Sequence, residues 1–330
     1  MLKRLRGSAR SVARLLSSPP ALLLYHRVCR PAFDPWGIAI SPEDFAAQMS
    51  WLARYRRPMS MADFVECLDQ GRMPRGAVGV TFDDGYVDNL LYAKPILKKY
   101  RIPATLFVAT GFVTSGGRFW WDRLSDALLR SVGAVDWTLN AGTERIKIRW
   151  DEDVRPDPYW RAWQPAPGVR EATFLTIWTI LQRLPAVARD IAVREIEARH
   201  PAPMDSEARA MTEHELSQMI DGGLITLGAH TVTHPALTTV GDLDLRWELK
   251  ESRDVCSRLQ GRTIAGFAYP YGDMSAGVRS ATLAAGFQWA CSTECKPAPL
   301  KPSPEQRLAL PRLVPPSAGA PALARVLRAL

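Results

Sequence analysis

The chain has 330 residues, of which 47% are hydrophobic and 23% are charged. This length favours either about two domains or one large α/β barrel with an insertion, and the composition is that of an ordinary globular protein. Collagen-like, fibrous and wholly disordered chains are excluded.

The positive charge is concentrated at one end of the chain. The formal net charge is +8, and residues 1–30 carry seven basic side chains and no acidic one, which leaves the remainder nearly neutral. Because a nucleic-acid groove would need basic residues within the fold itself, we expect no nucleic acid partner.

Residues 1–18 combine this charge with an apolar stripe. The pattern predicts a basic amphipathic helix that lies on an anionic membrane surface; the alternative is a first helix packed on the protein with a solvated basic face. The segment lacks the apolar core of a secretory signal, and no stretch of the chain reaches the ~20 apolar residues of a membrane span. We therefore expect a cytoplasmic protein, peripheral at the inner face of the cell membrane. The apolar positions at helical spacing are Leu2, Leu5, Ala9, Val12 and Leu16.

The five cysteines are odd in number and scattered, which predicts reduced thiols rather than a disulfide framework. Cys291 and Cys295 are four residues apart, but no histidine lies near them and there is no second pair. They are therefore only a weak indication of a zinc site.

Two parts of the chain alternate short buried strands with amphipathic helices. The first part predicts strands at 21–25, 77–82 and 104–109, with helices from 41 to about 55, from near 60, and at 87–100. The second part predicts helices at 212–219, 243–260 and 275–285, with strands at 225–229, 264–268 and 308–314. This alternation is typical of βα repeats and predicts a parallel sheet.

Residues 115–210 interrupt the repeats and hold seven of the eleven tryptophans. Alternating residues at 135–139 and 145–150 predict a β-hairpin, and 171–200 is expected to be helical. We expect an N-terminal helix at 1–18, a barrel split between 19–114 and 211–315, an inserted Trp-rich subdomain at 115–210 and a C-terminal tail at 316–330.

Two adjacent carboxylates, Asp83 and Asp84, follow the predicted strand at 77–82. In a parallel α/β sheet the carboxyl ends of the strands form the active-site edge. Adjacent acids repel each other, so a divalent metal on one would leave the other ionised as a base. The alternative is a structural Asp-Gly turn in which an Asp caps the following helix.

His230 and His234 follow the strand at 225–229 and reach the same edge of the sheet. Both imidazoles can face one ion if the loop between them curls. With Asp84 they would form a site of two histidines and one carboxylate, with open positions for water and substrate. Incidental loop histidines are the alternative, but two polar clusters at strand ends so far apart in sequence make coincidence a weaker explanation.

These residues resemble the motifs of a known enzyme family, the polysaccharide deacetylases of the NodB-homology type (carbohydrate esterase family 4). Thr81 to Gly85 is similar to the first motif of that family, His230 to His234 to the second, and Phe267 to Gly272 to the third. The similarity covers roughly residues 20–112 and 211–315. It leaves out the insertion and the basic N-terminus.

The resemblance implies a deformed (β/α)7 barrel and a metal-dependent N-deacetylase of amino sugars. By the same resemblance, the metal ligands are Asp84, His230 and His234, the usual metal is zinc, and Asp83 is the catalytic base. Tyr271 is the residue of the third motif whose backbone amide holds the oxyanion. Fe(II), Co(II) or Mn(II) would suit the same ligands.

Three features depart from the family pattern. Ala268 stands where the third motif carries an arginine that steadies the base, and Arg312 on the last predicted strand is a candidate replacement, with a surface arginine as the alternative. The Asp-rich fourth motif has no counterpart around residues 286–293. The family's general acid, a histidine on a late strand, is also missing, because no histidine follows His234.

Two further residues are assigned by position. His26, at the end of the strand at 21–25, would lie beside the last strand of a nearly closed barrel, so we nominate it as the catalytic acid; a hydrogen-bonded core histidine is the alternative. Trp121 could place its indole over a sugar, although tryptophans at helical spacing are more often core residues. The residues counted as substrate-binding are Tyr271, Trp121 and Arg312, while His200 and His214 receive no role.

Residues and resemblance together predict a metal-dependent hydrolase that removes N-acetyl or N-formyl groups from amino sugars of a polysaccharide, an oligosaccharide or a lipid-linked glycan. A non-catalytic glycan-binding protein on the same fold is the alternative, because the later motifs are altered. The presence of Asp83 favours the enzyme, since binding alone needs only the metal ligands. Amide and ester substrates are both open, since one activated water attacks either.

Overall fold

The computed structural model describes residues 19–113 and 116–329, so the predicted basic helix at 1–18 lies outside the described residues. Its centre is a sheet of seven parallel strands, ordered β1-β5-β6-β9-β10-β11, with β4 paired to β5. The strands are β1 (Ala21–Tyr25), β4 (Arg57–Met59), β5 (Ala77–Phe82), β6 (Ala104–Val108), β9 (Ile225–Ala229), β10 (Gly266–Ala268) and β11 (Trp289–Cys291).

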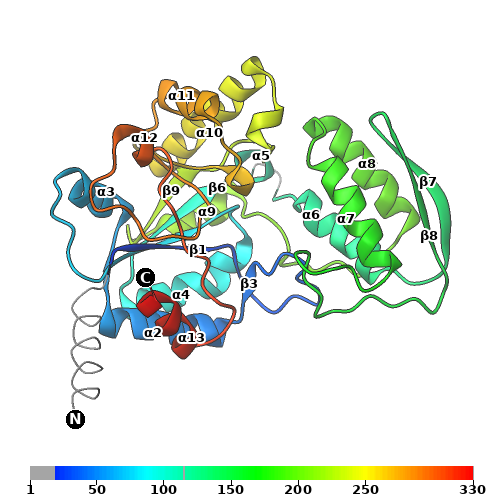
Figure 1. Cartoon of the computed structure of the whole chain (residues 1–330), viewed down its shortest axis with the longest axis horizontal. Helices are drawn as coiled ribbons and strands as arrows, with labels where there is room; N and C mark the ends of the chain where they lie inside the picture. The colour runs from blue at the N-terminus through cyan, green and yellow to red at the C-terminus, as the bar shows by residue number, and fades with distance from the viewer. Residues whose placement is uncertain (1–18, 114–115, 330) are drawn as a thin grey trace, which may run out of the picture.

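Helices flank this sheet (Figure 1), and several begin at a serine or threonine whose hydroxyl accepts a hydrogen bond from the backbone N–H three residues on. The predicted helix start at Ser41 is one of these caps. No helix within the described part of the chain is long and apolar enough to cross a bilayer. The helices around the sheet are α2 (Pro42–Tyr55), α3 (Met61–Asp69), α4 (Lys94–Tyr100), α9 (Glu213–Ile220), α10 (Asp242–Gln260), α11 (Ala276–Ala284), α12 (Pro304–Arg307) and α13 (Ala320–Ala329).

A short segment near the C-terminal end joins the two outer strands of the curled sheet. Leu313 pairs with Leu23 of β1, and Leu310 pairs with Cys291 of β11, both in the parallel sense. Backbone hydrogen bonds of 2.8 to 2.9 Å accompany both pairings. The fold is therefore a deformed (β/α)7 barrel, which confirms the predicted fold class; the strand predicted at 308–314 is reduced to these two bridges.

Between β6 and β9 the chain builds a separate group of elements beside the barrel (Figure 1). The predicted hairpin is present, and the predicted helical segment is divided in two at residues 182–185, because Pro185 lacks the N–H that a continuous helix would use. Their aromatic side chains form most of a second hydrophobic cluster, which Tyr86 of the barrel also joins. Helix α5 (Thr110–Val113) comes first and lies on the barrel beside α10. The elements of the group itself, the inserted segment, are α6 (Trp120–Ser125), β7 (Val135–Ala141), β8 (Glu144–Trp150), α7 (Val169–Leu181) and α8 (Ala186–Arg199).

His200, which follows α8, is a buried structural residue of this group. Its ring lies between Trp137 and Trp150, with centroid distances of 5.7 and 5.2 Å. Trp137 Nε1 donates a hydrogen bond of 2.9 Å to His200 Nε2, which requires that nitrogen to be unprotonated. Burial lowers the pKa of His200 to about 4.

We expect the protein to lose stability as the pH falls from about 6.5 to about 4, because the unfolded chain then binds a proton that folded His200 does not. The contribution of this residue is at most about 3 kcal/mol. Chemical denaturation at about pH 7.5 and about pH 5 should show a smaller pH dependence for His200→Gln, which keeps an acceptor for Trp137. His214→Gln, on the exposed side of α9, is the control variant. An unchanged dependence in His200→Gln would contradict this assignment.

Candidate metal centre

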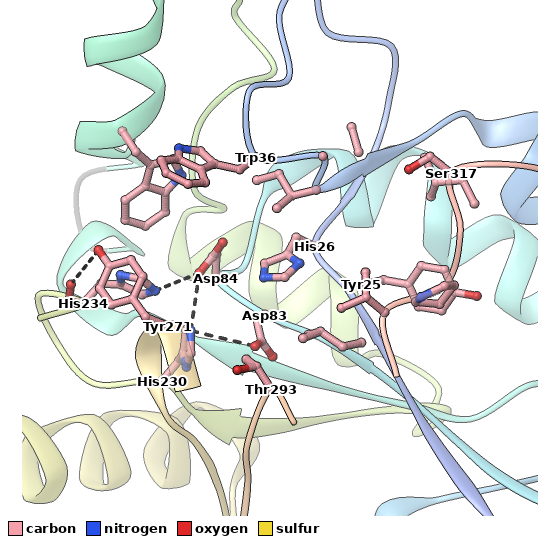
Figure 2. A pocket seen from close by; sticks show the side chains of 18 of the residues that line it. Tyr25, His26, Trp36, Asp83, Asp84, His230, His234, Tyr271, Thr293 and Ser317 are labelled. Carbon is pink, nitrogen blue, oxygen red and sulfur yellow. Dashed lines mark hydrogen bonds and ion pairs between the residues drawn. The ribbon is translucent and has the colours of Figure 1, made fainter. Parts of the chain in front are cut away.

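The predicted site residues meet at the carboxyl ends of the barrel strands. Asp83 and Asp84 follow β5, His230 follows β9 and His26 follows β1, while Tyr271 lies just beyond β10. Figure 2 shows these side chains around one pocket. Residues far apart in the chain come together there because parallel strands end at the same edge of a sheet.

Within residues 19–113 and 116–329, Asp84, His230 and His234 are the only group of three or more His, Cys, Asp or Glu side chains placed to share a metal. Asp84 Oδ1 lies 3.5 Å from His230 Nε2 and 3.4 Å from His234 Nε2. The three ligand atoms lie within 4.8 Å of one another, and all three residues are buried. The five cysteines are free thiols, and Cys291 and Cys295 take part in no such group among the described residues.

The protonation of these side chains suits a metal ion. His230 Nδ1 lies 2.8 Å from the carbonyl oxygen of Ala268, so this nitrogen carries the ring proton and the lone pair of Nε2 faces Asp84. Burial lowers the pKa of His230 and His234, which keeps both imidazoles neutral, as ligation requires. Asp84 Oδ1 is buried without a hydrogen-bond partner among the described residues, and such an atom is costly unless a cation meets it.

The loops that carry these residues hold a rare backbone conformation. Among the described residues, five other than glycine have a positive φ, and four of the five lie at this site. The left-handed region is costly for residues with a side chain, so such angles persist only where the surroundings enforce them, and they concentrate at functional sites. The four are Asp84 (72°), Thr231 (66°), His234 (55°) and Tyr271 (59°).

A buried arginine binds Asp83. Arg312 donates from Nη1 to Asp83 Oδ1 at 2.6 Å and from Nη2 to Oδ2 at 2.7 Å. It also donates hydrogen bonds to Ser292 O at 3.0 Å and to Thr81 Oγ1 at 3.3 Å. Arg312 therefore provides the cation that Ala268 cannot. It is fully buried and is not among the described residues that line the pocket, so it contacts Asp83 rather than a substrate, which corrects its assignment as a substrate-binding residue.

The two adjacent carboxylates are shifted in opposite directions. Burial alone would raise the pKa of Asp83, but the charge and the hydrogen bonds of Arg312 hold the pKa below its ordinary value. Burial and the Asp83 carboxylate together raise the pKa of Asp84 well above its ordinary value. A cation beside Asp84 would reverse that shift. Asp83 is thus ionised near neutral pH, and a cation beside Asp84 would favour its ionised form as well.

His26 lines the same pocket, beside these carboxylates (Figure 2). Asn89 Nδ2 donates to its backbone carbonyl at 2.8 Å, while its ring makes no hydrogen bond to the described residues. Burial lowers the pKa of His26 to about 4, although the nearby Asp83 opposes this shift. The resting imidazole is therefore neutral near pH 7.

The pocket has a volume of about 410 Å³ and an aromatic wall. Trp36 and Trp178 lie 4.3 Å apart between ring centroids, and Trp178 lies 5.8 Å from Tyr271. The Tyr271 ring is in turn 4.6 Å from the ring of His234, and its hydroxyl lies 3.5 Å from the carbonyl oxygen of that residue. The candidate metal site therefore borders a surface suited to flat apolar faces.

Trp121 is both a core residue and a wall of this pocket. Its ring stacks on Phe119 at 4.8 Å, and its Nε1 donates a hydrogen bond of 2.6 Å to the hydroxyl of Tyr86. The centroid of the indole also lies 4.6 Å from the centroid of the His234 ring. The two readings of Trp121 are thus compatible, because one buried side chain contacts the core and faces the metal group.

Sequence reasoning missed two residues of the aromatic wall. Trp36 belongs to the loop between β2 (Arg27–Val28) and β3 (Ala39–Ile40), where no pattern pointed to a site. Trp178 lies on α7, and its only signal was the high tryptophan content of the inserted segment. Thr293 also lines the pocket, in the region where the fourth motif has no counterpart.

Fold and site together define a parallel barrel with a candidate metal site at the carboxyl ends of its strands. The chain belongs to the polysaccharide deacetylase family. The family model described as polysaccharide deacetylase matches residues 70–139 and 176–290, which together make up more than half of the chain. The resemblance seen in the sequence motifs is thereby confirmed. The match also includes parts of the segment 115–210, which the sequence motifs had left outside the resemblance.

Curated relatives match a shorter stretch. The chain is 37% identical over 78 residues to the poly-beta-1,6-N-acetyl-D-glucosamine N-deacetylase of Staphylococcus aureus (strain MSSA476). It is 34% identical over 80 residues to the protein of the same name from Staphylococcus epidermidis. These matches cover 23% of this chain and 26% and 27% of the relatives, so the chain matches about a quarter of their length.

Two solved structures share the fold over nearly the whole chain. The deacetylase PplD of Streptococcus pyogenes, in complex with acetate, has a TM-score of 0.60 at 17% identity, over 94% of this chain and 98% of that one. IcaB from Ammonifex degensii has a TM-score of 0.56 at 20% identity, over 94% of this chain and 97% of that one. At these identities the likeness establishes the fold.

We expect the purified protein to bind about one Zn²⁺ per chain and to be stabilised by it, by ~2.7 kcal/mol at a free metal concentration 100 times the Kd. His230→Gln should weaken binding by more than ~100-fold, since contacts outside the ligand shell alone contribute 10–100-fold. Titration calorimetry on chelator-treated protein measures the stoichiometry and the affinity of Zn²⁺ binding, with His214→Gln as the control. Wild-type affinity in His230→Gln would remove this histidine from the metal site.

Proposed function

We propose that the protein is a metal-dependent hydrolase that removes N-acetyl or N-formyl groups from amino sugars of a polysaccharide, an oligosaccharide or a lipid-linked glycan. The observation that carries the proposal is that the two adjacent carboxylates have different partners. Asp84 faces two neutral imidazoles, whereas Asp83 is ionised by Arg312 and opens on the same pocket. Membership of the polysaccharide deacetylase family supports the same reaction.

The residues divide the work of amide hydrolysis. Asp84, His230 and His234 would hold the metal, for which zinc suits this ligand set. When bound, the metal supplies Lewis-acid polarisation of the amide carbonyl and lowers the pKa of a water molecule. Asp83 takes the proton of the water that attacks the carbonyl carbon. The backbone amide of Tyr271 is assigned to the oxyanion.

The C–N bond breaks only if the leaving amine is protonated, and we assign this step to His26. Its imidazole is neutral at rest, so it receives its proton during the reaction, from Asp83 after the water has attacked. The negative charge of the tetrahedral oxyanion favours the protonated imidazole at that stage. His26 then transfers the proton to the nitrogen, and Asp83 is again ionised for the next cycle.

The aromatic wall supports a sugar as the substrate. Trp121 and Tyr271 flank His234, and Trp36 and Trp178 extend the wall away from it. Their rings offer apolar faces of the size of a pyranose ring beside the reacting amide. Oligomers of β-1,6-linked N-acetylglucosamine are the first substrate to test, because the curated relatives carry that substrate in their name.

We expect Asp83→Asn to lower deacetylation of these oligomers by ~10²–10⁴-fold, because it removes the base and keeps the shape of the side chain. Metal content should stay at about one per chain, since Asp83 is not one of the ligands. Acetate or formate release and metal content are measured on the same preparations.

Undiminished turnover in Asp83→Asn would contradict its role as the base. A wild-type protein that binds metal and glycan but releases neither acid would instead favour the non-catalytic glycan-binding alternative, which needs the ligands and not the base. His214→Gln serves as the control, because it leaves every pocket residue unchanged.

We further propose that the protein works at the inner face of the cell membrane, attached through residues 1–18. The support is the sequence of that segment, which joins basic residues to an apolar stripe. A lipid-linked glycan would then be within reach of the pocket.

The full chain should co-sediment with vesicles that contain anionic lipids and should remain free with neutral vesicles. High salt should release it, because the attraction of basic residues to the surface is screened. Deletion of residues 1–18 should abolish sedimentation and leave deacetylation of soluble oligomers unchanged. Equal sedimentation of the deleted form would contradict the proposal.

A further inference from the structure

The loop between His230 and His234 receives a buried charged group from each side. One group comes from α10 of the barrel and the other from α8, on the inserted segment. The loop needs such support, because both Thr231 and His234 adopt the left-handed conformation, which is unfavourable for residues with side chains.

Glu248 of α10 holds the loop from the barrel side. Its Oε2 accepts hydrogen bonds from Val232 N at 2.6 Å and Thr233 N at 3.0 Å, and its Oε1 accepts one from Thr233 Oγ1. Glu248 is 4% exposed, so these bonds are screened little by water.

Arg189 of α8 holds the next peptide group of the same loop. Its Nη2 donates a hydrogen bond of 2.6 Å to Thr233 O, and the guanidinium lies 5.2 Å over the ring of Trp120. The side chain is 3% exposed. Thr233 is thus bound at its N–H and hydroxyl by Glu248 and at its carbonyl by Arg189, one residue before the ligand His234.

Arg189 forms no ion pair with a carboxylate of the described residues, although Glu248 and Asp190 lie near enough to attract its charge. Within the described residues Nη1 has no hydrogen-bond partner, and the neighbouring Asp190 is paired with Arg123 instead. A buried cation without an ion pair is unfavourable. Stability of α8 alone does not account for an arginine at this position, whereas its bond to the histidine loop does.

We propose that Arg189 is a positioning residue that holds His234 in place for metal binding, so that the inserted segment completes the metal centre. The inference rests on the metal site of the proposed function. It gives the inserted segment a direct part in the affinity for the metal, in addition to any contact with the glycan.

The test compares three variants in the full chain. Arg189→Gln removes the guanidinium, and Arg189→Lys keeps a cation that can donate to Thr233 O. Arg170→Gln is the matched control: Arg170 is also a buried arginine of the inserted segment bonded to carbonyl oxygens, those of Leu128 and Ser131 at 2.6 and 2.9 Å, and it has no contact with the loop. The readouts are the Zn²⁺ Kd by competition, the ligand-field spectrum of the Co²⁺ form and unfolding of the metal-free protein.

We expect Arg189→Gln to weaken Zn²⁺ binding by ~10–100-fold and to alter the Co²⁺ spectrum. Arg189→Lys should recover part of the affinity, and Arg170→Gln should lose stability with both metal readouts unchanged. Wild-type affinity and spectrum in Arg189→Gln, or an equal loss in Arg170→Gln, would overturn the inference and leave the proposed function standing.

If Arg189→Gln does not fold, Arg189→Lys decides. Wild-type metal readouts in Arg189→Lys would support a hydrogen-bond donor to the loop, and an affinity as weak as that of a metal-ligand variant would overturn it. A wild-type chain that binds no Zn²⁺ would overturn the proposed function itself.

Discussion

Two adjacent carboxylates buried at the end of one strand repel each other, and the site depends on how this repulsion is relieved. Arg312 bonds both oxygens of Asp83, while Asp84 turns toward the Nε2 atoms of two histidines, where a cation held by all three side chains would offset its charge. The relief comes from two different directions in the fold, since Arg312 lies on the segment that closes the barrel and the histidines lie on the loop after β9. The segment that closes the barrel is therefore also the segment that supplies the charge partner of Asp83.

The parts of the site that could be predicted are those with a local signal. Asp83 with Asp84 and His230 with His234 each follow a short run of buried residues, and such a run marks the end of a parallel strand in the sequence itself. The parallel sheet then brings the two pairs to one edge without further information. Arg312 could be proposed as the partner of Asp83 only from its residue type and its position on the last predicted strand. No sequence pattern indicates the bond between them, because it forms only once the sheet has curled.

The parts that could not be predicted depend on how the inserted segment packs on the barrel. Trp36 contacts Trp178, and Arg189 contacts Thr233. In each pair the two residues lie on different elements, and no sequence pattern links them. The sequence does not distinguish Glu248 from any other acidic residue of a helix. Its role is visible only in the structure, where two backbone N–H groups of the neighbouring loop donate to it. The apolar periodicity that identifies helices carries no information about these contacts.

The place of the inserted segment also bears on how the molecule folds. β6 and β9 are neighbouring strands, paired from Ala104 with Ile225 to Val108 with Ala229, yet the whole inserted segment separates them in the chain. Pairing across so long a loop is slow, because the loop loses conformational entropy before any contact is gained. During synthesis the two carboxylates after β5 leave the ribosome well before the histidines after β9. The nascent chain therefore passes through a period in which its barrel has an open edge and no capacity to bind metal at this site.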